Sequence, residues 1–276
     1  MESSTVAVPG ARLEVFSWGS GEPVVFIQTA LTADELRPLA TDPALAGYHR
    51  VVYHRRGYAK SSPVQGPGSI TRDAADCAAL LGELQIDRAH VVGLSFSGAV
   101  ALQLASNRPQ LAASLTLIEP APVHTPSSSE FRAANDRLIA SRRLHGPQAA
   151  LEEFLTIVIG PNWHQVTEDH LPGSSAQMRH DTGTFFDVDL PALLAWSFTA
   201  AHASRIDCPV LYVGGTDSGA WFTEVRELML AWLPHAEDVA IDGADHSLAL
   251  THAPQIADAL VTFLRRHPIR HRPRKP

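Results

Sequence analysis

Cysteine is scarce in this chain of 276 residues, which contains only two, Cys77 and Cys208. Secreted folds that depend on disulfides need a dense set of paired cysteines. Cys77 falls inside an expected helix and Cys208 precedes an expected strand, so we predict two free thiols. The shortage therefore excludes a disulfide-stabilised scaffold.

Long apolar runs are also missing from the sequence. No uninterrupted run reaches the roughly 18 residues that a membrane-spanning helix needs, and no charged leader with an apolar core opens the chain. We therefore expect a cytoplasmic protein without membrane contacts. With 45% hydrophobic residues, a chain of this length can bury the core of one large domain or of a domain carrying an insertion.

Positive charge is sparse outside the C-terminal end. Residues 265–276 hold six of the 22 basic residues and no acid, which leaves 16 basic and 29 acidic residues elsewhere. An acidic body argues against nucleic acid as a partner. Three prolines interrupt the basic tail, which we interpret as a solvated end without a catalytic role. A small-molecule substrate is the expected partner, and the sequence leaves monomer and homodimer open.

Signatures of metal and cofactor sites are lacking as well. The histidine pairs have no cysteine or carboxylate set at a familiar ligand spacing; these pairs are His49 with His54, His246 with His252, and His267 with His271. Gly214 and Gly215 do not form the G-x-G-x-x-G pattern that binds dinucleotides. We expect neither a metal ion nor a cofactor.

What the chain does have is a regular alternation of apolar runs and helical patterns. The apolar runs, each bounded by turn residues, are 13–18, 24–28, 51–54, 90–94, 115–118, 210–214 and 239–241. This alternation predicts an α/β fold with a mostly parallel central sheet and helices on both faces. Helices are expected over 71–84 and 253–264, and Thr32 with Glu35 resembles a capping box that opens a helix through Leu39.

The alternation stops after Pro120. Residues 127–203 have a helical pattern throughout, which predicts an inserted helical cap domain between the two parts, 1–126 and 204–276, of the core domain. We expect the cap at the carboxyl ends of the strands, where open α/β sheets bind ligands. Most of the aromatic residues in or beside the cap should pack helices and some should line a pocket: Trp163, Phe185, Phe186, Trp196, Phe198, Trp221 and Phe222.

The first candidate for catalysis is Ser95. It lies between the apolar run 90–94 and a helical segment rich in alanine, within Gly93-Leu94-Ser95-Phe96-Ser97-Gly98. A strand, a sharp turn and a helix are the context of a nucleophile elbow, although Ser97 occupies a position where glycine is usual. The alternative interpretation of Ser95 is a helix N-cap. We predict that it is a nucleophile, which requires a base and oxyanion donors.

His246 is the candidate base. It follows the last expected strand in a loop that can carry an imidazole over the strand ends to Ser95. The alternative is that His246 is a surface or structural histidine, because a chain with 14 histidines has many that are not catalytic.

The orienting acid is expected at Asp217, directly after the expected strand 210–214. A carboxylate there can accept a hydrogen bond from the second imidazole nitrogen and fix its tautomer. An Asx turn is the alternative role for Asp217. Glu119 is the rival acid, because it follows the preceding strand and faces the same crevice.

The order Ser95, Asp217, His246, with a strand ahead of each, resembles that of the α/β-hydrolase superfamily. Two framework segments strengthen the resemblance, which covers nearly the whole chain. Residues 53–62, with Arg56-Gly57 and a downstream serine, are similar to the family's strand-end signature, and residues 117–120 are similar to its exit into a lid. The resemblance implies an α/β-hydrolase fold of the esterase or lactonase-like branch that bears a lid.

The resemblance also implies an oxyanion hole. The family uses the backbone N–H after the nucleophile, here Phe96, and one from the loop after the first core strand. By position the second donor is Ala30, with Thr29 as the alternative through its backbone or hydroxyl. Gln28-Thr29 stands where the family often has His-Gly, so we expect a hole that is present but reshaped.

Three functions fit these residues. The leading one is a serine hydrolase that cleaves an ester, lactone or thioester of a moderately apolar small molecule through an acyl-enzyme. The second uses the same scaffold for acyl transfer, carbon–carbon bond cleavage or cofactor-free lyase or cyclase chemistry in a biosynthetic pathway. The third is a non-catalytic ligand receptor, because fold alone does not decide function.

Overall fold

The computed structural model describes residues 3–269, and the part of the basic tail beyond Ile269, with His271, lies outside them. Within this range one sheet runs through the molecule in the strand order β1-β2-β4-β3-β5-β6-β7-β8. Its strands are β1 (Ser4–Val8), β2 (Ala11–Trp18), β3 (Pro23–Ile27), β4 (His49–Tyr53), β5 (Ala89–Leu94), β6 (Ala112–Ile118), β7 (Val210–Gly215) and β8 (Glu237–Ile241).

The pairing of the strands confirms the predicted mostly parallel sheet. β1 and β2 pair antiparallel, as do β2 and β4, whereas every pair from β4 to β8 is parallel. β5 and β6 lie in the middle of the sheet and are buried throughout, which explains their continuous apolar pattern. β1 is an edge strand with mostly exposed residues, so its weak pattern gave no expected strand there.

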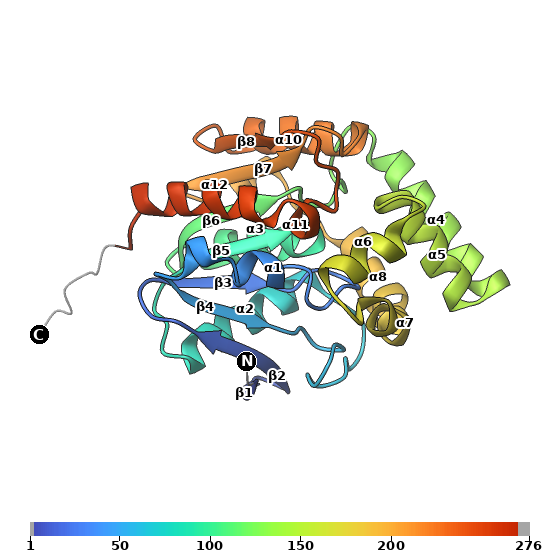
Figure 1. The fold of residues 1–276 in the computed structure, drawn as a ribbon, viewed down its shortest axis with the longest axis horizontal. Coiled ribbons are helices and arrows are strands. Elements are labelled where there is room, and N and C mark those ends of the chain that lie inside the picture. The colour runs from blue at the N-terminus through green and yellow to red at the C-terminus, as the bar shows by residue number, and fades with distance from the viewer. Residues whose placement is uncertain (1–2, 270–276) are drawn as a thin grey trace, which may run out of the picture.

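Helices cover both faces of the sheet, as predicted (Figure 1). One face packs against α2 (Ile70–Glu83), α3 (Phe96–Asn107) and α10 (Ala220–Trp232). The other packs against α1 (Arg37–Ala40), the 3₁₀ turn η1 (Pro43–Leu45), α11 (Leu248–Thr251) and α12 (Ala253–Arg266). Both cysteines are free and buried, Cys77 in α2 and Cys208 ahead of β7, in agreement with the prediction of two thiols.

The two helices α2 and α1 differ in how their first turns are capped. Ser69 caps α2, because its side chain accepts a hydrogen bond from the Arg72 N–H at 3.3 Å. The expected capping box at Thr32 and Glu35 is wrong: α1 begins only at Arg37, and the Glu35 side chain makes no capping bond among the described residues. The reason is a turn in which the Thr32 N–H binds the Ala30 carbonyl, which bends the chain away from a helix.

Between β6 and β7 the chain forms only helices, at the end of the sheet where the parallel strands have their carboxyl ends (Figure 1). We call α4 through α8 the cap helices, and their division from the core as a domain stays a prediction. They are α4 (Ser128–His145), α5 (Pro147–Val158), α6 (Trp163–His170), α7 (Ser174–Thr184), the π-helical turn η2 (Phe185–Asp189) and α8 (Leu190–Ala195), followed by α9 (Ala200–Ala203). No helix in residues 3–269 is both long and apolar enough for a bilayer span.

Candidate active site

Ser95 occupies the sharp turn between β5 and α3. Its backbone angles are φ 50° and ψ −116°, which non-glycine residues rarely adopt and which surrounding structure must enforce. The Ser95 side chain makes no capping bond to α3, so the alternative role of an N-cap is not supported. Gly93 lets the helix approach the strand, because a Cβ on Gly93 would lie 2.4 Å from the Ser97 carbonyl oxygen.

Ser97 is accommodated where the family usually has glycine. It is fully buried, and its Oγ lies 2.9 Å from both the backbone nitrogen and the carbonyl oxygen of Leu94. The position where the helix needs a glycine is the next one, Gly98, because a Cβ there would lie 3.0 Å from Pro120. The departure at Ser97 therefore leaves the elbow intact.

His246 is paired with Glu119. Its Nδ1 lies 2.7 Å from Glu119 Oε2, and both side chains are buried, with 8% and 1% of their surface exposed. Glu119 Oε1 accepts a second hydrogen bond, from the Gly215 N–H at 2.7 Å. The Phe222 ring stacks on the imidazole with centroids 3.9 Å apart. These contacts fix the position of the ring and the nitrogen that it presents to the carboxylate.

The prediction that Asp217 holds the imidazole is wrong. Asp217 is exposed, and its carboxylate accepts a hydrogen bond from the Thr216 hydroxyl at 3.1 Å. The turn after β7 fixes its direction, because the Asp217 N–H binds the Ala244 carbonyl. Gly215 makes room for this close approach, since a Cβ there would lie 2.1 Å from the Ala244 oxygen. The rival acid, Glu119, takes the place beside His246.

The loop after β3 faces Ser95, and Ala30 and Phe96 both line the cavity there. The Thr29 hydroxyl is already engaged, because it donates to the Leu94 carbonyl at 3.0 Å. The next N–H along the chain, that of Leu31, donates to the Tyr58 hydroxyl at 2.8 Å. Ala30 and Phe96 remain the predicted oxyanion donors, and the Thr29 hydroxyl is not available for that role.

A buried ion-pair network binds the carbonyl groups of the loop after β3. Arg55 donates through Nε to the Gln28 carbonyl at 3.0 Å and through a terminal nitrogen to the Thr29 carbonyl at 3.3 Å. The same guanidinium binds Asp73 at 2.7 Å and Asp189 at 2.7 Å. Asp189 belongs to η2, so a cap residue supports the loop on which Ala30 lies.

Tyr58 joins the same network from the other side of the loop. Its hydroxyl accepts the Leu31 N–H and donates to Asp189 Oδ2 at 2.5 Å. Leu31 has φ 63°, so the loop bends sharply at the residue that Tyr58 holds. We call Arg55, Tyr58, Asp73 and Asp189 the loop-support network. The sequence singled out the segment 53–62 but gave no signal for Asp189, which lies more than 130 residues away in the chain.

Ser95 and His246 line one cavity of about 160 Å³ between the strand ends and the cap helices. No hydrogen bond joins their side chains among the described residues; such bonds commonly close only when substrate is bound. Of the seven aromatic residues considered above, Phe185, Trp221 and Phe222 line the cavity. Trp163, Phe186, Trp196 and Phe198 are buried elsewhere in helix packing.

Glu35 is a cavity residue that sequence reasoning missed. It lies on the cavity wall with Ser95 and His246, although its spacing from Thr32 suggested only a helix cap. Burial raises the pKa of the Glu35 carboxyl to about 7, and the nearby His246 opposes this rise. No local pattern could have indicated this position, because cap helices and core loops that are distant in sequence form the cavity.

The raised pKa of Glu35 predicts a pH-dependent stability. A carboxyl with a higher pKa in the folded state favours the neutral form, so the free energy of unfolding falls as pH rises from about 4.5 to about 7. Glu35→Gln removes this loss and should be more stable than wild type by about 2 kcal/mol at pH 8, with little difference at pH 5. Urea unfolding at both pH values measures this, and Glu227→Gln on the exposed face of α10 is the control. A constant difference across pH would contradict the prediction.

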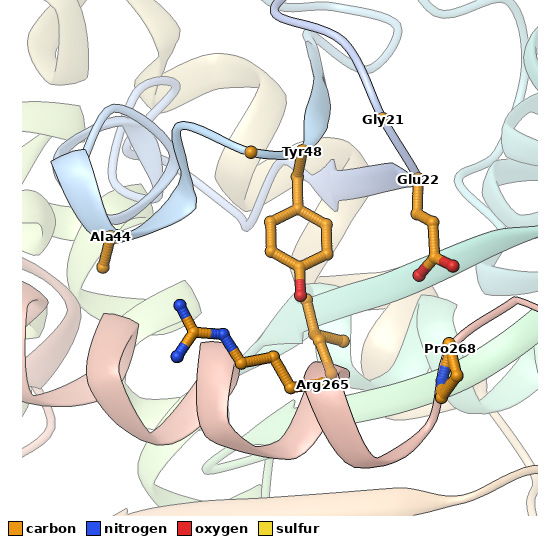
Figure 2. A pocket seen from close by; sticks show the side chains of 8 residues that line it. Gly21, Glu22, Ala44, Tyr48, Arg265 and Pro268 are labelled. Atoms are coloured by element: carbon orange, nitrogen blue, oxygen red, sulfur yellow. The ribbon is translucent and has the colours of Figure 1, made fainter.

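A second hollow lies at the opposite end of the sheet, near the amino ends of β3 and β4. Figure 2 shows the Tyr48 ring in its centre, with its hydroxyl toward α12, Arg265 on one side and Glu22 on the other. The hollow is larger, about 400 Å³, but neither Ser95 nor His246 reaches it. Its position away from the carboxyl strand ends makes the smaller cavity the candidate active site.

Comparison with known proteins identifies the family and the fold. Residues 6–259 match the model of the alpha/beta hydrolase family. The chain is 28% identical over 242 residues to a protein of Pseudomonas syringae pv. syringae that carries the name carbamate hydrolase RutD; the match covers 86% of this chain and 89% of that protein.

Two solved structures show the same fold. A thermophilic esterase from Thermogutta terrifontis superposes with a TM-score of 0.81 at 21% identity, covering 97% of this chain and 100% of that one. The enol-lactonase from Burkholderia xenovorans LB400 superposes with a TM-score of 0.79 at 21% identity, covering 95% and 100%. Because the family model spans nearly all of the sheet and the cap helices, the chain belongs to the alpha/beta hydrolase family.

Proposed function

We propose that this protein is a serine hydrolase that cleaves an ester, lactone or thioester bond of a small, moderately apolar molecule through an acyl-enzyme. The observation that carries the proposal is the buried pair of His246 and Glu119 beside the cavity whose wall holds Ser95 in a strained turn. The names of the similar proteins, an esterase, an enol-lactonase and a carbamate hydrolase, support bond hydrolysis at a carbonyl carbon.

In the proposed mechanism each residue has its own step. His246 Nε2 takes the proton from Ser95 Oγ while Oγ attacks the carbonyl carbon, and Glu119 stabilises the imidazolium that forms. The N–H groups of Ala30 and Phe96 stabilise the oxyanion. When the intermediate collapses, the bond to the leaving group breaks and His246 gives its proton to that group. His246 then takes a proton from water, whose oxygen attacks the carbonyl carbon of the acyl-enzyme. The bond between the acyl group and Ser95 Oγ breaks, His246 returns the proton to Oγ, and the acid leaves.

The cavity limits the substrate in size and polarity. Its volume of about 160 Å³ holds only a small acyl or alcohol group. Most of its wall is apolar: Ala30, Leu31, Phe96, Ala121, Pro122, Phe131, Phe154, Leu155, Ile157, Val158, Ile159, Phe185, Leu190, Leu193, Trp221 and Phe222. Such a lining favours short, largely apolar chains, with the few polar groups on the wall setting their orientation.

A covalent label tests the nucleophile. A fluorophosphonate should modify Ser95, as identified by mass spectrometry of the folded protein, because an activated serine attacks phosphorus as it attacks a carbonyl. Ser95→Ala should lose the label and lower kcat/KM for p-nitrophenyl acetate by at least about 10³-fold. Ser97→Ala, two residues away in a buried position without access to the cavity, is the matched control for labelling. An unlabelled Ser95, together with an active Ser95→Ala variant, would refute the proposal.

A further inference from the structure

Glu35 and His246 are the ionisable side chains on the wall of the active-site cavity, within the part of the chain that the structure describes. His246 already has a partner in Glu119. The Glu35 carboxyl accepts no hydrogen bond from any described side chain or backbone N–H, whereas Glu119 on the same side of the molecule accepts two. Glu35 therefore has unused capacity to accept hydrogen bonds.

The cations of the protein near Glu35 are engaged elsewhere. The neighbouring Asp34 is paired with two basic groups, His54 at 3.2 Å and Arg37 at 3.3 Å. The nearby His246 acts on the Glu35 carboxyl, but its own hydrogen bond goes to Glu119. An ionised carboxylate in a mostly apolar cavity is costly without a partner, and burial accordingly raises the pKa of Glu35 to about 7.

The rest of the wall suits a positive charge. Six aromatic side chains line the same cavity: Phe96, Phe131, Phe154, Phe185, Trp221 and Phe222. Aromatic faces attract cations through their ring quadrupoles, and a desolvated site strengthens that attraction. The Ser218 hydroxyl also lies on the wall, and its oxygen is buried with no hydrogen-bond partner among the described residues. The wall of one cavity thus carries a carboxylate, an unpartnered hydroxyl and aromatic rings.

We propose that the cavity selects substrates that carry a protonated amine, and that Glu35 binds this ammonium group as the specificity-determining residue. The inference rests on the proposed function, because a substrate presupposes that the protein hydrolyses it. The binding of an amine at Glu35 does not require hydrolysis. The ammonium replaces the missing protein cation, so it restores the charge balance that the cavity lacks. Amino esters and amino lactones are therefore the substrate class, in preference to their neutral counterparts of equal size.

Direct binding tests the amine site without catalysis. Calorimetric titration at pH 8 compares n-hexylamine with n-hexanol, which has the same chain but no charge. Wild type should bind the amine at least about tenfold more tightly than the alcohol, because a desolvated ion pair discriminates strongly between charged and neutral ligands. Glu35→Gln should lose this preference. Glu227→Gln, a removal of the same charge on the exposed face of α10, should keep it.

Kinetics test the same preference in turnover. Two matched pairs place the amine on either side of the scissile bond: phenyl 6-aminohexanoate with phenyl heptanoate, and 6-aminohexyl acetate with heptyl acetate. The amine should raise kcat/KM by at least about tenfold over the neutral ester in one pair for wild type, and Glu35→Gln should abolish that difference.

The outcomes separate the two proposals. Equal binding of n-hexylamine and n-hexanol to wild type, or an unchanged preference in folded Glu35→Gln, would overturn the amine site. Hydrolysis of the neutral esters would then still uphold the hydrolase. An amine preference in binding without hydrolysis of any of the four esters would uphold the amine site and count against the proposed function. Thermal unfolding of Glu35→Gln establishes that the variant is folded.

Discussion

Glu119→Gln is expected to lower kcat for an ester substrate about 10³- to 10⁴-fold, while Asp217→Asn leaves it within about twofold. The amide keeps the size of Glu119 but can present an N–H to Nδ1 of His246, which favours the wrong imidazole tautomer. The hydrogen bond of 2.7 Å, in which Nδ1–H donates to the carboxylate, would then be reversed in direction. Steady-state kinetics on p-nitrophenyl acetate, with circular dichroism to show that both variants are folded, measures the effect.

Asp217→Asn is the matched control for this experiment. Asp217 follows the neighbouring strand, loses the same charge on substitution and is the acid that the sequence favours. Its carboxylate is exposed and bonded only to Thr216 within the described part of the chain. If Asp217→Asn proved the more damaging change, the carboxylate that orients His246 in turnover would come from β7 and the observed pair would not be the catalytic one.

Asp189→Asn is expected to destabilise the protein by about 3 kcal/mol and to lower kcat at least about tenfold. The substitution removes a buried charge that faces Arg55, and Asp73 alone then remains to balance the guanidinium. The Tyr58 hydroxyl also loses its acceptor, so the loop that carries Ala30 is held less firmly. Urea unfolding measures the stability, and kinetics well below the unfolding temperature measure the turnover.

Asp187→Asn provides the matched control in the same turn of the cap. Asp187 pairs with Arg142 on an exposed surface, so its loss should change the free energy of unfolding by less than about 1 kcal/mol and leave kcat unchanged. The expected signature of Asp189→Asn is a lower kcat with KM within about threefold, because an oxyanion loop acts on the transition state. A variant that loses stability but keeps full kcat would show that the loop-support network is structural only.

The sequence by itself determined the fold and two of the catalytic candidates. Strand positions followed from apolar runs because the central strands are buried on both faces, and the helices of the core followed from their amphipathic spacing. Ser95 and His246 could be selected because each is tied to a local signal, a glycine-bounded turn and a loop after the last strand. Both residues line the candidate cavity.

Tertiary structure alone decided which acid meets His246. Glu119 and Asp217 follow neighbouring strands, β6 and β7, so the chain order fits either of them. The backbone resolves the choice: Glu119 adopts φ 41° and its carboxylate receives the Gly215 N–H, while the turn after β7 leaves Asp217 in solvent. The direction of a side chain at a strand end depends on such long-range contacts. The local sequence pattern therefore does not predict it.

The same limit applies to Glu35 and Asp189. Glu35 had a local interpretation as a helix cap, but a turn at Ala30 places it on the cavity wall instead. Asp189 lies in the cap, and only the packing of the cap on the core brings it to Arg55. Periodicity indicates which face of a helix or strand is buried, so it predicted the strands β2 to β8 and the helices α2 and α12. The walls and supports of the cavity come from segments far apart in sequence, and only the folded chain brings them together.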